Sequence, residues 1–119
     1  MRLVIAVAVQ DSRFLLVYNP KRKGWEFPGG VVEEDETDRE ACVREFREEV
    51  GFDFIPTHEI KTMQFTLYIG KMGKNIGKGE MKWSFFEELP ENMAFPRAEY
   101  ITILKEIRNL KKENPLMKF

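Results

Sequence analysis

Glu45, Glu48 and Glu49 lie within five residues of one another, in a segment that has the apolar spacing of an α-helix. At 3.6 residues per turn, the three carboxylates share one face of that helix. The helix also has a separate apolar arc, formed by Cys42, Val43, Phe46 and Val50. We therefore expect the apolar arc to pack against a core and the carboxylates to lie together on a different side.

The carboxylate face needs an explanation because like charges at i,i+3 and i,i+4 repel by roughly 0.2–0.5 kcal/mol per pair. A divalent cation would relieve this repulsion. Oxygen ligands without accompanying His or Cys suit Mg²⁺ or Mn²⁺ better than zinc. The alternative is an ordinary solvated face with ion pairs between Glu40 and Arg44 or between Arg44 and Glu48. The helix by itself leaves both interpretations open.

The spacing of the surrounding residues favours the metal hypothesis. Gly30 is followed after five residues by Glu36, and after seven more by the run from Arg44 to Phe52, which reads REFREEVGF. This pattern resembles the signature of the Nudix hydrolase family at every fixed position, and Trp25–Gly30 resembles the usual lead-in to that signature. One departure is Glu34-Asp35, which stands where the family often has Pro-Gly.

The resemblance implies a metal site that acts on a phosphate substrate. By similarity, Glu45, Glu48 and Glu49 bind Mg²⁺ (or Mn²⁺), and the carbonyl of Gly30 is a further ligand. Glu80, which follows the signature segment, resembles the glutamate that often supplies an extra ligand or the general base; otherwise it is a charge at a strand edge. Either Glu45 or Glu80 would then take the proton from the attacking water.

Other residues of the segment are expected to fix the helix. The resemblance implies that Glu36 holds Arg44, which in turn orients the adjacent catalytic glutamate. Thr37 or Asp38 is the expected N-cap, because short side-chain oxygens there accept hydrogen bonds from free backbone N–H groups. Gly51 is expected to end the helix as its C′ residue.

Candidate substrate-binding residues lie outside the helix. Lys21 and Lys23 would be solvated loop residues in most proteins, but beside a phosphate site they could pair with substrate oxygens. The candidates for stacking on a base are Trp25, Phe27 and Tyr68, each of which could instead belong to the core. Tyr68 stands sixteen positions after Phe52, where a tyrosine resembles diadenosine polyphosphate hydrolases. His58, the single histidine, is expected at the surface.

Apolar and turn patterns predict one α+β domain over residues 1–119. Strands are expected at 3–9, 13–18, 58–70 and 80–88, with short extended pieces up to residue 32 and a turn-rich stretch at 70–79. Helices are expected at 38–50 and 97–112. The second helix has an expected inner stripe of Ile101, Leu104, Ile107 and Leu110. The Nudix resemblance implies an α/β/α sandwich with a mixed sheet.

Composition limits the possible partners. The net charge is −1, which argues against extended DNA binding, and no stretch approaches the ~20 apolar residues of a membrane span. Cys42 is the only cysteine and reads as core packing, so we expect a cytoplasmic protein without a disulfide. Met117 and Phe119 make a homodimer conceivable beside a monomer.

The expected activity is Mg²⁺-dependent hydrolysis of a phosphoanhydride in a nucleoside diphosphate derivative. The resemblance favours conversion of a small nucleoside triphosphate to the monophosphate and pyrophosphate. A diadenosine polyphosphate hydrolase is the first alternative, and removal of pyrophosphate from RNA ends is another. A catalytically silent nucleotide sensor would usually have lost one of the signature carboxylates, all of which are present in this chain.

Overall fold

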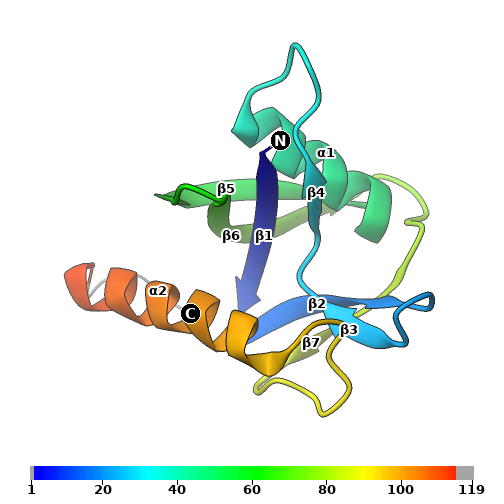
Figure 1. The fold of residues 1–119 in the computed structure, drawn as a ribbon. Helices are drawn as coiled ribbons and strands as arrows, with labels where there is room; N and C mark the ends of the chain where they lie inside the picture. Colours follow the sequence, from blue (N-terminus) through cyan, green and yellow to red (C-terminus); the bar gives the residue numbers. More distant parts are fainter. Residues whose placement is uncertain (1, 115–119) are drawn as a thin grey trace.

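The structure of this protein is a computed structural model that describes residues 2–114. Its elements, in chain order, are β1 (Leu3–Gln10), β2 (Arg13–Asn19), β3 (Gly24–Glu26), β4 (Gly29–Val31), α1 (Asp38–Val50), β5 (Phe52–Lys61), β6 (Phe65–Asn75), β7 (Lys82–Phe86) and α2 (Arg97–Glu113). Figure 1 shows that α1 and α2 lie on opposite sides of β1 and β6.

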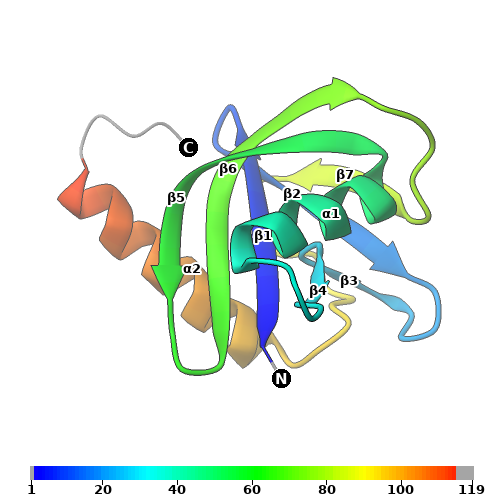
Figure 2. The ribbon, with the colours of Figure 1, turned by 90° about the horizontal axis from the view of Figure 1, so that it is seen from above.

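The strands form one mixed sheet in the order β3-β2-β1-β6-β5, with β4 beside β1 and β7 beside β2. Strand β1 is its centre: it runs parallel to β6 and antiparallel to β4, and its last two residues pair with β2. Figure 2 shows β5 and β6 as one long, curved hairpin beside β1. The β1–β4 pairing brings Gly29 and Gly30 next to Ile5 and Val4, in front of α1.

Side-chain alternation along β1 divides the core into two layers. Val4, Ala6 and Ala8 join the apolar arc of α1, whereas Val7 joins the residues under α2. The predicted α+β sandwich, with a mixed sheet between two helices, is therefore confirmed. The predicted helix bounds agree with α1 and α2 to within one residue.

The prediction of a single strand over residues 58–70 is wrong. This part of the chain turns between β5 and β6, where the Thr62 hydroxyl accepts hydrogen bonds from the N–H groups of Gln64 (3.2 Å) and Phe65 (3.0 Å). The turn contains no Gly or Pro, so the usual turn signal is missing.

The prediction of a turn-rich stretch at 70–79 is also wrong in its first half, because β6 continues to Asn75. Gly70 lies inside this strand, where a Cβ would collide with the Ile55 carbonyl oxygen of β5. The glycine thus marks a close approach of two strands and not a turn.

The buried side of α2 is turned relative to the predicted stripe. Tyr100, Ile103 and Ile107 are buried, whereas Ile101 is 47% exposed. Ile101 was therefore wrongly expected to face the core; Tyr100 and Ile103 take that side at helical i,i+3 spacing. Met117 and Phe119 lie outside the described residues. Neither described helix is long and apolar enough to cross a membrane.

Candidate active site

The first turn of α1 is fixed by its N-cap. Thr37 is the capping residue: its hydroxyl accepts from the N–H of Glu40 (3.1 Å), and the Glu40 carboxylate accepts from the N–H of Thr37 (2.9 Å). This capping box shows that Thr37, and not Asp38, is the N-cap of α1. Gly51 ends the helix with φ 80°, a conformation that favours glycine, so its predicted role is confirmed.

Asp38 ties the same turn to the sheet. Its carboxylate accepts from the Thr66 hydroxyl of β6 (2.6 Å) and from Nε of Arg2 (3.1 Å). The hydrogen bond from buried Thr66 is the main cause that holds the pKa of Asp38 below its usual value, followed by Arg2. Sequence reasoning missed this anchor because its three partners are far apart in the chain.

The last turn of α1 is held by the segment that precedes β7. The N–H groups of Glu80 and Met81 donate to the carbonyls of Glu48 and Glu49, each at 2.9 Å. These two bonds satisfy carbonyls that a helix end leaves free. They also bring Glu80 beside the acidic face, where its charge is one of those that raise the pKa of Glu49.

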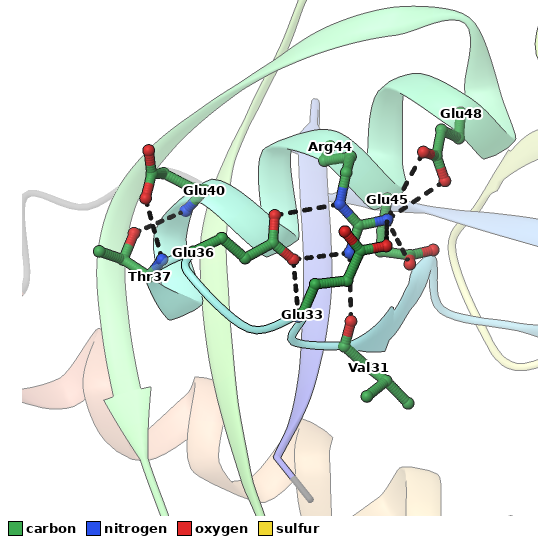
Figure 3. A network of polar contacts seen from close by, with 8 residues as sticks. All are labelled: Val31, Glu33, Glu36, Thr37, Glu40, Arg44, Glu45 and Glu48. Carbon is green, nitrogen blue, oxygen red and sulfur yellow. Dashed lines mark hydrogen bonds and ion pairs between the residues drawn. The ribbon is translucent and has the colours of Figure 1, made fainter.

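Arg44 is the centre of the polar network shown in Figure 3. Its guanidinium donates to both carboxylate oxygens of Glu36 (2.7 and 3.1 Å) and to Glu45 (2.9 Å). Further contacts reach the Val31 carbonyl (3.1 Å) and Glu48 (3.4 Å). The predicted pairing of Glu36 with Arg44 is thus present, and it lowers the pKa of Glu36 and raises that of Arg44. Glu33 adds a longer ion pair of 3.8 Å to the same guanidinium.

Glu45 packs against Gly30 of β4. A Cβ on Gly30 would lie 2.5 Å from the Glu45 carboxyl carbon, so a larger residue there would displace this carboxylate. Burial raises the pKa of Glu45, and the hydrogen bond from Arg44 opposes that rise. Arg44 and Gly30 together fix the carboxylate at the junction of α1 and β4.

Glu49 is the most deeply buried of the three glutamates, at 8% exposure. One of its oxygens accepts from the N–H of Gly29 (3.1 Å). Burial raises its pKa to about 8, and the charges of Glu45, Glu26 and Glu80 add to the rise. A carboxylate with such a pKa is poorly stabilised by its protein surroundings, which suits a group that awaits a cation.

The donor set fits a hard divalent cation, because it consists of carboxylate oxygens on one helix face and the main chain of Gly30. Within residues 2–114, however, no three acidic, His or Cys side chains converge closely enough to enclose an ion. The ion pairs explain this spread: Glu45 and Glu48 both turn toward Arg44, while Glu49 turns toward Gly29. Metal binding would draw the partly exposed Glu48 away from Arg44.

A cleft of ≈ 400 Å³ is lined by Gly29 and Gly30 of β4, which contact Glu49 and Glu45, although no residue of α1 lines it. Its other walls come from the start of β1, the β2–β3 turn, β3 and the start of α2. Its lining side chains include Arg22, Glu26, Phe27, Phe95 and Tyr100. A larger cavity of ≈ 510 Å³ lies on the other side of α2 and has no wall from α1 or β4, so it is not connected to the carboxylates.

The predicted substrate residues differ in whether they line the cleft. Phe27 lines the cleft, although it is largely buried. Trp25 is not among the residues that line it, and its ring packs edge-on against Phe86. Lys21 and Lys23 are exposed in the turn between β2 and β3. Arg22, the middle residue of this basic run, lines the cleft, although only the two lysines were predicted as substrate residues.

Tyr68 faces away from this cleft. It is 3% exposed and packs in the layer beneath α1, so its ring offers no surface for a base. Cys42 is buried in the same layer, where burial raises the pKa of its thiol to about 12. This agrees with a packing role for Cys42.

Comparison with known proteins supports one family. A model of the NUDIX domain matches residues 1–113. The chain is 42% identical over 57 residues to a CTP pyrophosphohydrolase of Escherichia coli, which covers 44% of this chain and 42% of that protein. It is 36% identical over 84 residues to an uncharacterized Nudix hydrolase of Bacillus subtilis, covering 71% of this chain and 51% of the relative. The chain thus spans about half or less of these curated relatives.

Solved structures show the same fold. A UDP-X diphosphatase superimposes with a TM-score of 0.73 at 20% identity, covering 92% of this chain and 63% of that one. A pyrophosphohydrolase of Bacillus subtilis superimposes with a TM-score of 0.71 at 25% identity, covering 94% and 82%.

Proposed function

The chain belongs to the Nudix hydrolase family, and from that membership we propose that it is a Mg²⁺-dependent nucleotide pyrophosphohydrolase. The proposed reaction converts a nucleoside triphosphate to the monophosphate and pyrophosphate. One observation carries the proposal: Gly30 lines the cleft and also lies against the carboxylate of Glu45. A nucleoside in the cleft would therefore extend its phosphates across the acidic face of α1.

The residues that would hold the ion are Glu45, Glu48, Glu49 and the main chain of Gly30. Bound Mg²⁺ offsets the phosphate charge and lowers the pKa of a coordinated water. The water oxygen forms a bond to phosphorus as the bond to the bridging oxygen breaks, and pyrophosphate leaves with the electron pair. The proton of the water passes to a carboxylate of the chain.

Two glutamates are candidates for that carboxylate. Glu45 is held in place by Arg44 and Gly30, which favours a fixed ligand. Glu80 is exposed and is tied to α1 through its backbone only, so its side chain is available for proton transfer. We assign the base to Glu80 and expect Glu80→Gln to lower kcat while leaving metal affinity almost unchanged.

The class of substrate is supported by what the relatives are named for. The matches include a CTP pyrophosphohydrolase and an RNA pyrophosphohydrolase of Halorhodospira halophila, which is 49% identical over 47 residues. The formal net charge of −1 favours a small nucleotide over RNA, whose binding usually needs a basic surface.

A dinucleoside polyphosphate is a second candidate substrate. A further cavity of ≈ 460 Å³ shares Leu3, Ile5, Glu99 and Ile103 with the cleft. The two cavities are therefore neighbours, and the second adds apolar walls next to the space for one base.

Product analysis tests the proposal. Purified protein is incubated with Mg²⁺ and nucleoside triphosphates, diadenosine tetraphosphate, ADP-ribose or triphosphorylated RNA, and the products are separated by chromatography. We expect a monophosphate and pyrophosphate from a triphosphate, and no product with EDTA. A folded protein that binds nucleotide but cleaves none of these compounds would instead be a sensor.

A further inference from the structure

The cleft beside Gly30 contains three charged side chains, Arg22, Glu26 and Glu99, among mostly apolar walls. Among the described residues, no ion pair joins Arg22 to either glutamate. The cleft thus offers a ligand one strong donor and two strong acceptors. Flat apolar walls with a few placed polar groups are typical of a site that selects its ligand by hydrogen bonding.

Arg22 is an exposed side chain that lies over the Phe95 ring in the lining of the cleft. Its guanidinium carbon lies 4.4 Å from the centre of the Phe95 ring, a cation–π contact. Its backbone N–H donates to the side-chain oxygen of Asn19 (3.3 Å), which fixes the turn that carries it. Stacking uses the face of the guanidinium and leaves the N–H groups at its edge free to donate to a carbonyl oxygen.

Glu26 is the better placed of the two acceptors. It is half-buried on β3, and one carboxylate oxygen accepts from the side-chain N–H of Asn19 (2.7 Å). Glu26 lines the same cleft as Tyr100 of α2 and as Gly29, whose N–H donates to Glu49. Glu99 is exposed in the first turn of α2 and has no comparable support.

We propose, on the basis of the function proposed above, that this cleft selects bases that carry both an amino group and a carbonyl group. Glu26 accepts from the amino group, and Arg22 donates to the carbonyl oxygen. Guanine and cytosine have both groups. Adenine has no carbonyl, and uracil, thymine and hypoxanthine have no amino group. A carboxylate and a guanidinium are the side chains that best match these two edges.

The test is equilibrium binding of nucleoside monophosphates, measured by calorimetry in EDTA. CMP is compared with UMP and GMP with IMP, because each pair differs at the amino group. We expect the wild-type protein to bind CMP and GMP about tenfold or more tightly than their partners. Equal affinities within both pairs would overturn the proposal.

Two matched variants assign the selectivity to one carboxylate. Glu26→Gln keeps the size of the side chain and can still accept from Asn19, but its amide N–H now faces the ligand. We expect it to abolish the preference within each pair, whereas Glu99→Gln should retain it. A preference that survives in Glu26→Gln, or is lost in Glu99→Gln alone, would contradict the role of Glu26.

This measurement separates the inference from the function on which it rests. Monophosphates contain no phosphoanhydride, so their binding does not depend on catalysis. A clear base preference in a protein that hydrolyses no triphosphate would contradict the proposed function and support base selection by Glu26. Hydrolysis of all triphosphates without base preference would support the proposed function and contradict base selection by Glu26.

Discussion

Helices α1 and α2 are held in the fold by different means. α1 has a capping box at one end, an αL glycine at the other, and polar ties to the sheet through Asp38 and to the segment before β7 through two carbonyls. α2 begins after Pro96 without a side-chain cap and rests on Tyr100, Ile103 and Ile107. Cavities lie on both of its sides.

The difference matches a division of tasks. A metal site needs carboxylates fixed to within a fraction of an ångström, and α1 is positioned by many independent contacts. A substrate cleft must adapt to its ligand, and the wall formed by α2 is supported mainly by apolar packing. Damage to α1 should therefore affect the reaction rate, whereas damage to α2 should affect substrate affinity and choice.

The largest effect is expected from Glu48→Gln and Glu49→Gln, on the α1 side of the comparison. Loss of a carboxylate that stabilises bound metal should lower kcat by about a hundred- to a thousandfold, with base preference unchanged. Steady-state kinetics with a preferred and a poor triphosphate measure both quantities. Glu34→Gln, a change in an exposed loop, is the matched control. Near-normal turnover of either variant would remove that residue from the metal site.

The buried charge on α1 should also make stability depend on pH. The pKa of Glu49 is raised in the folded protein, to about 8, so the folded state binds a proton that the unfolded state releases above about pH 4.5. In EDTA, stability should fall between pH 5 and pH 8, by roughly 2–4 kcal/mol. Urea unfolding of the wild type and of Glu49→Gln measures this. If the unfolding free energy changes equally with pH in both proteins, a group other than Glu49 causes the pH dependence.

Arg44→Lys tests whether the network in Figure 3 positions Glu45 as a metal ligand. An ammonium group cannot contact both oxygens of Glu36 and also hold Glu45, so we expect kcat to fall about ten- to a hundredfold. Arg47→Lys is the matched control, since within residues 2–114 the one ion pair of Arg47 is with Asp53 at 3.0 Å. Equal effects of the two changes would argue against a special role for Arg44.

The smallest effect on rate is expected on the other side of the molecule. Ile103→Ala removes buried apolar contacts between α2 and the sheet, which should cost about 2 kcal/mol of unfolding free energy. KM should rise severalfold while kcat changes little, because the carboxylates of α1 are untouched. Steady-state kinetics of this variant give KM and kcat, and urea unfolding gives the loss of unfolding free energy. A fall in kcat with constant KM would break the proposed division between the helices.

The same contrast explains what could be predicted from sequence. The bounds of α1 and the role of Gly51 depend on residues close in the chain, where caps and helical spacing carry the information. The Glu36–Arg44 pair was expected from the resemblance to the Nudix signature. The tie between Asp38 and Thr66, and the cleft beside Gly30, depend on the pairing of β1 with β4 and β6. Such pairings leave no local pattern to read.

The errors have related causes. The hairpin turn at Thr62 is made by a side-chain hydroxyl and contains no glycine or proline. Tyr68 was placed near the substrate from its distance along the chain, but strand alternation points it toward α1. The first error comes from a turn without the usual turn residues, and the second from a strand whose pairing with β1 decides which face is buried.

The most direct test of the assignment of α1 is a titration with Mn²⁺ followed by electron paramagnetic resonance. It needs no substrate, so it does not depend on the choice of nucleotide. We expect the wild-type protein to bind Mn²⁺ in competition with Mg²⁺. Each of the variants Glu45→Gln, Glu48→Gln and Glu49→Gln should bind Mn²⁺ about tenfold or more weakly. The control Glu34→Gln should bind Mn²⁺ as tightly as the wild type. Unchanged affinity in all three variants would contradict a metal site on this helix.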